Sequence, residues 1–249
     1  MIENYHITDE SAENLRQALL QFTESVERYT LPYKNLKLNI EQFQPVLDTL
    51  RKLSLTVNAA KKLAEVQFVL INRVSFEFIN RAIDEDINKL AEQFLITDEL
   101  IGSVNNLSVL DNNRVFKQSI QAFNKGSYDL AIIGFTAVLD KVLSDHSGEI
   151  TQVNIKSRCT TIKNKIEDKG DDFLDELEGR DLLLYLTYPK AVELFGKSSS
   201  FGNEEPELLN RHWIMHGRSN RAYTKLDCVK VLNMIYGTVR MGQLGKEDG

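Results

Sequence analysis

Apolar residues recur at three- and four-residue spacing along almost the whole chain, and this periodicity restricts the fold more than any other feature. Only 4 prolines and 13 glycines interrupt the 249 residues, which favours long helices over many tight turns. The pattern therefore predicts an all-α protein. The expected helices cover approximately residues 15–31, 40–50, 57–83, 87–101, 115–123, 128–143, 155–166, 182–195 and 224–239.

Breaks in the periodicity predict how these helices are grouped. The polar stretch 102–106, Gly-Ser-Val-Asn-Asn, is the best candidate for a domain boundary. It would separate an N-terminal helical region, residues 1–105, from a C-terminal helical domain, residues 106–249. Pro189 predicts a kink or a break between two short helices, because proline lacks the amide hydrogen that continues a helix.

Local residue choices predict several helix ends in the C-terminal half. Ser127 is a plausible N-cap for an apolar helix from Tyr128 to Leu143, which 146–148, His-Ser-Gly, would end. Small residues in that helix would let another helix approach closely. They are Ala131, Gly134 and Ala137. A second start is expected at 204–207, Glu-Glu-Pro-Glu, and Thr224 and Asp227 stand at capping-box spacing before the last helix.

Composition narrows the class of protein. Two distant cysteines, Cys159 and Cys228, make a disulfide framework or a cysteine-based zinc site improbable. The polar, acidic opening Met-Ile-Glu-Asn-Tyr does not resemble a secretory leader, and no apolar stretch approaches the roughly 20 residues that span a bilayer. We therefore expect a cytoplasmic protein without membrane contact. A net charge of −6 argues against a protein that coats nucleic acid with its whole surface.

One short stretch departs from this acidic character. Residues 208–226 contain four cationic side chains and two histidines but no aspartate or glutamate: Arg211, Arg218, Arg221, Lys225, His212 and His216. Arginine supplies a charged fork that fits phosphate oxygens, and histidine exchanges a proton near neutral pH. Together these groups are sufficient for metal-free RNA cleavage, in which a base deprotonates the ribose 2′-hydroxyl and a cation stabilises the phosphoryl oxygens.

The segment Leu-Leu-Asn-Arg-His-Trp-Ile-Met-His-Gly-Arg, residues 208–218, resembles the signature of HEPN (higher eukaryotes and prokaryotes nucleotide-binding) domains. Active members carry an arginine, a polar residue after it, and a histidine after four to six intervening residues. Here Arg211 and His216 enclose four residues, and His212 takes the polar position. The helix that follows Gly126 also resembles the apolar first helix of that domain. The resemblance covers approximately residues 112–240, whereas residues 1–105 match no family.

The resemblance implies an α-helical bundle that dimerises and brings two copies of the motif together across a cleft. It implies a metal-independent endoribonuclease without a cofactor, acting as a toxin or an anti-phage (abortive infection) effector. Arg211 would bind and polarise the phosphate, His216 would be the acid/base, and His212 would orient the substrate. Arg218, Arg221 and Lys225 would contact the RNA backbone. The implied partners are RNA, a second copy of the chain, and an antitoxin or another defence protein.

Other interpretations of the same residues stay open. Arg211 could form a structural ion pair with Asp140 or Glu207, and His216 could simply stabilise a helix C-terminus. Residues 213–215, Trp-Ile-Met, are expected in the core or in a dimer contact, and the three flanking cations could be only solvated. A non-catalytic module that binds RNA or a nucleotide, or that scaffolds a defence complex, is the alternative function. A zinc site on His212 and His216 is a distant third.

Overall fold

The computed structural model describes residues 57–70, 102–104, 106–149, 154–170, 179–197 and 204–246. The chain divides into two units, Met1–Leu50 and Arg51–Gly249, and every described residue belongs to the second. All regular secondary structure in these ranges is helical, so the predicted all-α class is confirmed. The helices expected over 15–31, 40–50 and 87–101 lie outside the described residues.

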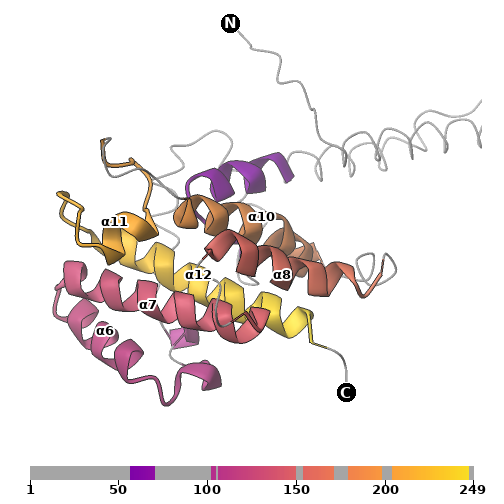
Figure 1. The fold of residues 1–249 in the computed structure, drawn as a ribbon, viewed down its shortest axis with the longest axis horizontal. Helices are drawn as coiled ribbons and strands as arrows, with labels where there is room; N and C mark the ends of the chain where they lie inside the picture. The colour runs from indigo at the N-terminus through magenta and orange to yellow at the C-terminus, as the bar shows by residue number, and fades with distance from the viewer. Residues whose placement is uncertain are drawn as a thin grey trace, which may run out of the picture. The chain divides into compact units, whose positions relative to one another are not determined.

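Two long helices, α7 (Tyr128–Ser147) and α12 (Lys225–Leu244), pack along each other at the centre of the described bundle (Figure 1). Helix α6 (Arg114–Asn124) packs on α7, and α8 (Ile155–Glu167) contacts both long helices. Helix α10 (Gly179–Gly196) packs against α8 and α12. The short helix α11 (Arg211–Met215) lies against α7. The described elements also include a helix over residues 57–65, the helical residues 102–104 and the 3-10 helix η1 (Ser108–Leu110).

Several predicted helix ends are confirmed. Thr224 and Asp227 form a capping box, in which the Thr224 hydroxyl accepts from the Asp227 amide and the Asp227 carboxylate accepts from the Thr224 amide. Gly126 and Gly148 adopt positive φ angles of 75° and 79° after α6 and α7, where glycine is favoured. Ser127 is the N-cap of α7, although its side chain makes no capping hydrogen bond.

The expected close approach at the small residues of α7 occurs at Gly134. A Cβ atom there would lie 1.8 Å from the Ser119 hydroxyl of α6, so only glycine fits with this packing. At this contact the aromatic rings of the two helices lie together. The ring centroid of Phe135 is 6.2 Å from the ring centroids of Phe116 and Phe123. All three rings are buried and belong to the same core.

Three predictions about helix boundaries are wrong. The helix expected over 57–83 ends at 65, because Gln67 adopts a left-handed φ of 63°. Helix α10 continues through Pro189, so of the kink or break expected there the break is absent, and the kink stays a prediction. Residues 204–210 are not helical, and the helix starts at Arg211 instead. In the last case the side chain of Asn210 caps the helix, accepting from the amides of His212 and Trp213.

The turn after residue 65 is stabilised from outside its own helix. The amide of Phe68 donates to the carbonyl of Leu63, and that of Gln67 to Ala64, which is the pattern of a Schellman motif. A glutamine replaces the usual glycine at its left-handed position, which costs conformational energy. The Gln67 side chain is fully buried, and its amide pairs with the backbone of Leu209 in both directions: Nε2 donates to the carbonyl at 2.6 Å, and Oε1 accepts from the amide at 2.9 Å.

The residues after Gln67 are held in the same way. The side chain of Asn233 in α12 makes two hydrogen bonds with the backbone of Val69, 2.8 and 3.0 Å long, and the Thr187 hydroxyl of α10 accepts from the amide of Leu70 at 3.0 Å. Residues 57–70, which the sequence analysis assigned to the N-terminal region, therefore share the core of the C-terminal helices. A separate role for residues 1–105 stays a prediction.

Replacing the Gln67 amide should loosen this connection. In Gln67→Leu both backbone groups of Leu209 lose their partners while they stay buried, at about 1–3 kcal/mol for each unsatisfied group. We therefore expect a free energy of unfolding lower by about 2–5 kcal/mol, measured by urea denaturation. Gln118→Leu on the exposed side of α6 is the matched control. Equal midpoints for the two variants would show that the double hydrogen bond contributes nothing.

Candidate functional site

The motif predicted from the sequence lies on a single helical turn. Helix α11 contains only Arg211–Met215, and His216 is its C-cap. Gly217 has a φ of 60°, and the amide of Arg218 donates to the carbonyl of Trp213, so a second Schellman motif ends the helix. At the other end, Nδ2 of the capping Asn210 donates to the carbonyl of Lys197 at 2.8 Å, which ties α11 to the end of α10. Both ends of the motif are thus fixed.

Arg211 is oriented by an acid from α7. Its Nε donates to both carboxylate oxygens of Asp140, at 2.9 and 2.8 Å, and its Nη2 donates to Oδ2 at 2.6 Å. The two side chains are only 15% and 18% exposed, so the pair is largely shielded from water. Of the two partners considered from the sequence, Asp140 is the one observed. The pair uses the Nε edge of the guanidinium, and the N–H groups on Nη1 are not required by Asp140.

The two histidines face each other across one turn. Their rings are stacked, with centroids 6.0 Å apart and planes inclined by 12°. Partial burial, together with the neighbouring charges of Arg211 and His216, lowers the pKa of His212 below its ordinary value. A lowered pKa leaves this imidazole neutral at pH 7, which is the form that accepts a proton. His216 is exposed at the end of the helix.

Two of the three apolar residues between them lie in the core, as expected. Trp213 and Ile214 are buried, at 7% and 2% exposure, whereas Met215 is 39% exposed. Trp213 and Ile214 also line a shallow cavity of about 400 Å³ together with Ile133 and Asp129 of α7. The helix is therefore anchored by its apolar side while its polar groups stay at the surface.

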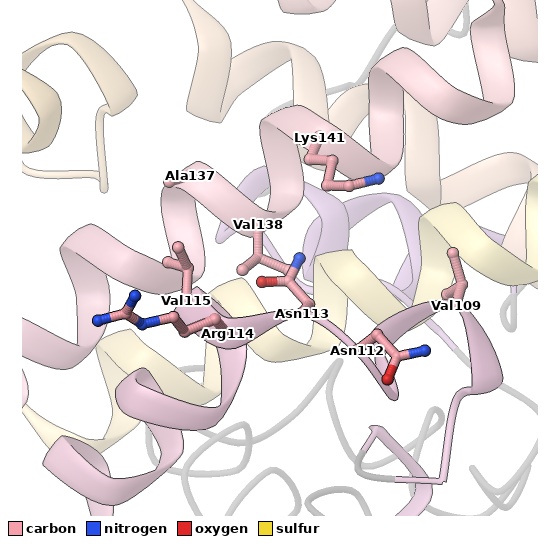
Figure 2. Close-up of a pocket in the computed structure, with 8 residues that line it drawn as sticks. All are labelled: Val109, Asn112, Asn113, Arg114, Val115, Ala137, Val138 and Lys141. Carbon is pink, nitrogen blue, oxygen red and sulfur yellow. The ribbon is translucent and has the colours of Figure 1, made fainter.

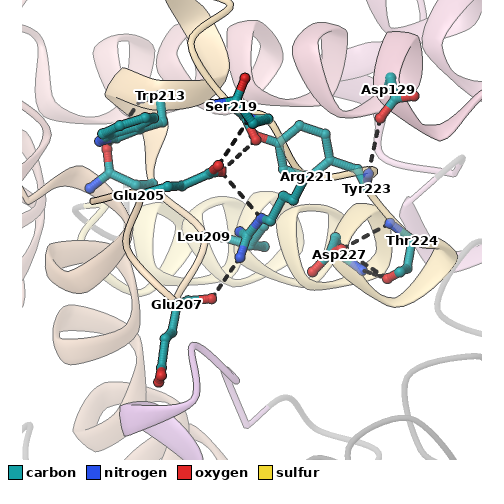
Figure 3. Close-up of polar contacts among 12 residues, drawn as sticks. Asp129, Glu205, Glu207, Leu209, Trp213, Ser219, Arg221, Tyr223, Thr224 and Asp227 are labelled. Atoms are coloured by element: carbon teal, nitrogen blue, oxygen red, sulfur yellow. Dashed lines mark hydrogen bonds and ion pairs between the residues drawn. The ribbon is translucent and has the colours of Figure 1, made fainter. Parts of the chain in front are cut away.

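The flanking cations are less available than the sequence suggested. Glu205 binds the loop that carries them: its carboxylate accepts from the Ser219 hydroxyl and from the Asn220 amide, and lies 3.5 Å from Nε of Arg221 (Figure 3). Nη1 of Arg221 also donates to the carbonyl of Glu207 at 2.7 Å. Glu205, which precedes residues 208–226 in the sequence, thus partly neutralises their positive charge in the folded protein.

The other two predicted RNA contacts differ from Arg221. Arg218 is exposed directly after α11, whereas Lys225 is half-buried as the first residue of α12. The loop between them is fixed to α7, because the Asp129 carboxylate accepts from the amide of Tyr223 at 3.0 Å (Figure 3). The structure brings Arg211, His212 and His216 together on α11 and leaves the three flanking cations along the following loop.

Sequence reasoning did not find the residues that position the motif. Asn210 stands directly before Arg211 in the sequence and has the residue type that caps helices, so its role could have been predicted. Glu205 was interpreted as part of a helix start. Gln67 lies 142 positions before its partner Leu209, and no local pattern indicates that pairing.

The described residues give no support to the zinc interpretation. In the ranges that the structure covers, no group of three or more histidine, cysteine, aspartate or glutamate side chains is arranged to hold a metal ion. Within the same ranges, none of the helices is both long and apolar enough to cross a bilayer.

The pair between Arg211 and Asp140 should be energetically coupled. A double-mutant cycle with Arg211→Ala and Asp140→Ala is expected to give a coupling free energy of about 1.5–3 kcal/mol, because the hydrogen bonds join charged groups with little exposure. The matched control is the pair between Lys141 and Asp145 on the same helix, which is 55% and 43% exposed and should couple by about 0.5 kcal/mol or less. Thermal or urea denaturation of the six variants and wild type measures both. Equal coupling in the two cycles would contradict a buried role for Asp140.

No family model, curated protein or solved structure matches this chain. The function is therefore argued from the geometry of α11 and its neighbours.

Proposed function

We propose that this chain is a metal-independent endoribonuclease of the HEPN type that acts as a toxin or an anti-phage effector. The observation that carries the proposal is the arrangement on α11: two stacked histidines beside an arginine whose guanidinium is fixed by Asp140. One histidine has a lowered pKa and the other is exposed. These are a base, an acid and a phosphate-binding cation within one turn of helix.

Two imidazoles and the RNA account for every proton and bond of this reaction. A neutral imidazole takes the proton from the ribose 2′-hydroxyl, and the 2′-oxygen attacks the adjacent phosphorus. The bond between phosphorus and the 5′-oxygen breaks, and a protonated imidazole gives its proton to that oxygen. The products are a 2′,3′-cyclic phosphate and a free 5′-hydroxyl. Arg211 stabilises the negative charge that grows on the non-bridging oxygens in the transition state.

Asp140 has a supporting role in this scheme. It fixes one edge of the guanidinium, which removes conformational entropy from the arginine before the substrate arrives. The structural ion pair and the catalytic role are therefore compatible, since one carboxylate orients the group that binds phosphate. The proposed roles are phosphate binding for Arg211, acid/base catalysis for His216, and orientation or proton exchange for His212.

The second candidate function is a non-catalytic module that binds RNA or a nucleotide, or that scaffolds a defence complex. Two observations favour it. The net charge of the chain is −6, and the carboxylates of Asp140 and Glu205 already neutralise two of the arginines near the motif. An assay of RNA cleavage beside an assay of RNA binding distinguishes the two functions.

A homodimer is the assembly that we propose for the active form. The solvent side of α7 carries large apolar residues at helical spacing, with Leu130 68% and Ile133 42% exposed. Ala137 continues this stripe and lines a cavity of about 460 Å³ with Val115 of α6 (Figure 2). Because Ile133 also contacts the cavity under Trp213, the stripe reaches α11. A second copy that covers this stripe would bring its own motif to the same cleft.

Cleavage in the absence of metal tests the proposed function. Wild type is expected to cut total cellular RNA in EDTA and to leave 2′,3′-cyclic phosphate ends. His216→Ala should reduce the rate by about 100-fold or more, the usual contribution of a general acid or base. Arg211→Lys keeps the charge but loses the fork, and should also cut slowly. Lys117→Ala, an exposed lysine of α6, is the control. Folded wild-type dimers that bind RNA without cutting it would favour the binding module.

Charges on the apolar stripe should separate the proposed dimer. Leu130→Glu with Ile133→Glu places two carboxylates on the stripe, and burying them against a second copy is unfavourable. We expect a monomer by analytical ultracentrifugation and a loss of cleavage. Gln118→Glu with Gln121→Glu adds the same charge to the exposed side of α6 and should leave the dimer intact. A wild-type monomer that cleaves RNA would contradict the dimer.

A further inference from the structure

A cavity of about 610 Å³ is lined by Arg211 and His212 but by none of the three flanking cations Arg218, Arg221 and Lys225. Helix α8 contributes its first residues to the walls, and α10 contributes its last turn. The volume lies within the range of about 300–1,000 Å³ that is usual for sites holding a small molecule. Its lining residues are Asn154, Ile155, Lys156, Lys190, Glu193, Leu194, Gly196, Lys197, Arg211 and His212.

The charge of this cavity is strongly positive for an acidic protein. Three lysines and Arg211 line it against a single acid, Glu193. Lys190 lies in α10 and Lys197 directly follows its last residue; both are exposed, and both line the cavity. Lys156 pairs with Glu193 at 2.7 Å, but the two side chains are 64% and 44% exposed, and such surface pairs are weak enough to be exchanged for a phosphate.

The wall of the cavity is connected to the motif. The carbonyl of Lys197 accepts from the side chain of Asn210, and Asn210 caps the helix that carries Arg211 and His212. The backbone of Lys197 is therefore held close to the start of the helix that carries the arginine. The apolar lining consists of Ile155 and Leu194. The His212 imidazole is the one aromatic ring among the lining residues, which include no phenylalanine, tyrosine or tryptophan.

We propose that the cavity between α8 and α10 binds the sugar-phosphate backbone of a single RNA strand next to the cleaved bond, with Lys190 and Lys197 contacting phosphates. This inference rests on the proposed ribonuclease function and moves the main RNA contacts from residues 218–225 to α10. Because the cavity offers mainly charges, and its one aromatic ring is the His212 imidazole that takes part in the proposed reaction, it binds RNA with little base preference and with strong salt dependence.

Binding across a salt series tests this proposal. The probe is a fluorescent 12-nucleotide RNA with 2′-O-methyl groups, which cannot be cleaved by the proposed reaction, titrated by anisotropy from low to moderate salt. For single strands, each phosphate contact contributes about 0.7 to the slope of log K against log salt. Lys190→Gln with Lys197→Gln should therefore reduce the magnitude of the slope by about 1.4 and weaken binding at low salt. Lys117→Gln with Lys125→Gln, two exposed lysines at α6, removes the same charge and should leave the slope unchanged.

Cleavage of unmodified RNA separates the two proposals. If wild type cuts and the slope falls only in the α10 variant, both stand. If wild type does not cut but the slope still falls in that variant, the cavity binds RNA and the nuclease function fails. If wild type cuts while the α10 variant binds and cuts as the α6 control does, the cavity proposal is wrong and the nuclease function stands. An equal decrease of the salt-dependence slope in the α10 and α6 variants also overturns the cavity proposal, because such a decrease would reflect net charge alone.

Discussion

The double hydrogen bond between the Gln67 side chain and the backbone of Leu209 is the interaction on which the candidate site depends. Leu209 immediately precedes Asn210, the cap of α11, so the position of this one residue fixes where the motif begins. The amide of a glutamine imitates a neighbouring peptide group, and it satisfies a buried segment that belongs to no helix. To do so, Gln67 adopts a left-handed backbone conformation that is unfavourable for residues other than glycine.

This dependence links stability to chemistry. Helix α11 has five residues, too few to be stable in water by itself, so its conformation comes from its contacts. Those contacts are the cap at Asn210, the ion pair with Asp140, and the buried side chains of Trp213 and Ile214. Helix α7 supplies Asp140 and also faces Trp213 and Ile214, so the reactive groups on α11 keep their place only while the surrounding elements stay packed. The site is therefore sensitive to changes far from it in the sequence.

The sequence predicted what local rules determine. The periodicity of α6, α7, α8 and α12, the capping box at Thr224 and the close approach at Gly134 all follow from residue types within one helix or at its ends. The end of the helix at 65 could not be predicted in this way, because the turn is stabilised by partners more than 100 positions away. The helix also continues through Pro189, although local rules favour a break there.

The same distinction applies to the site. Arg211, His212 and His216 are adjacent in the sequence and were found there. What surrounds them was found only in part: Asp140, 71 positions before Arg211, was one of two candidate partners, whereas Glu205 neutralises a cation that looked unopposed in the sequence. Charges counted along the chain do not show which acids the fold brings close to a cation. They also do not show which cations from distant segments come to lie together. Lys156, Lys190 and Lys197 are spread over 42 positions and form one wall only because α8 packs on α10. An acidic protein can thus present a local anion site, because the field at a cavity is set by the nearest charges rather than by the net charge.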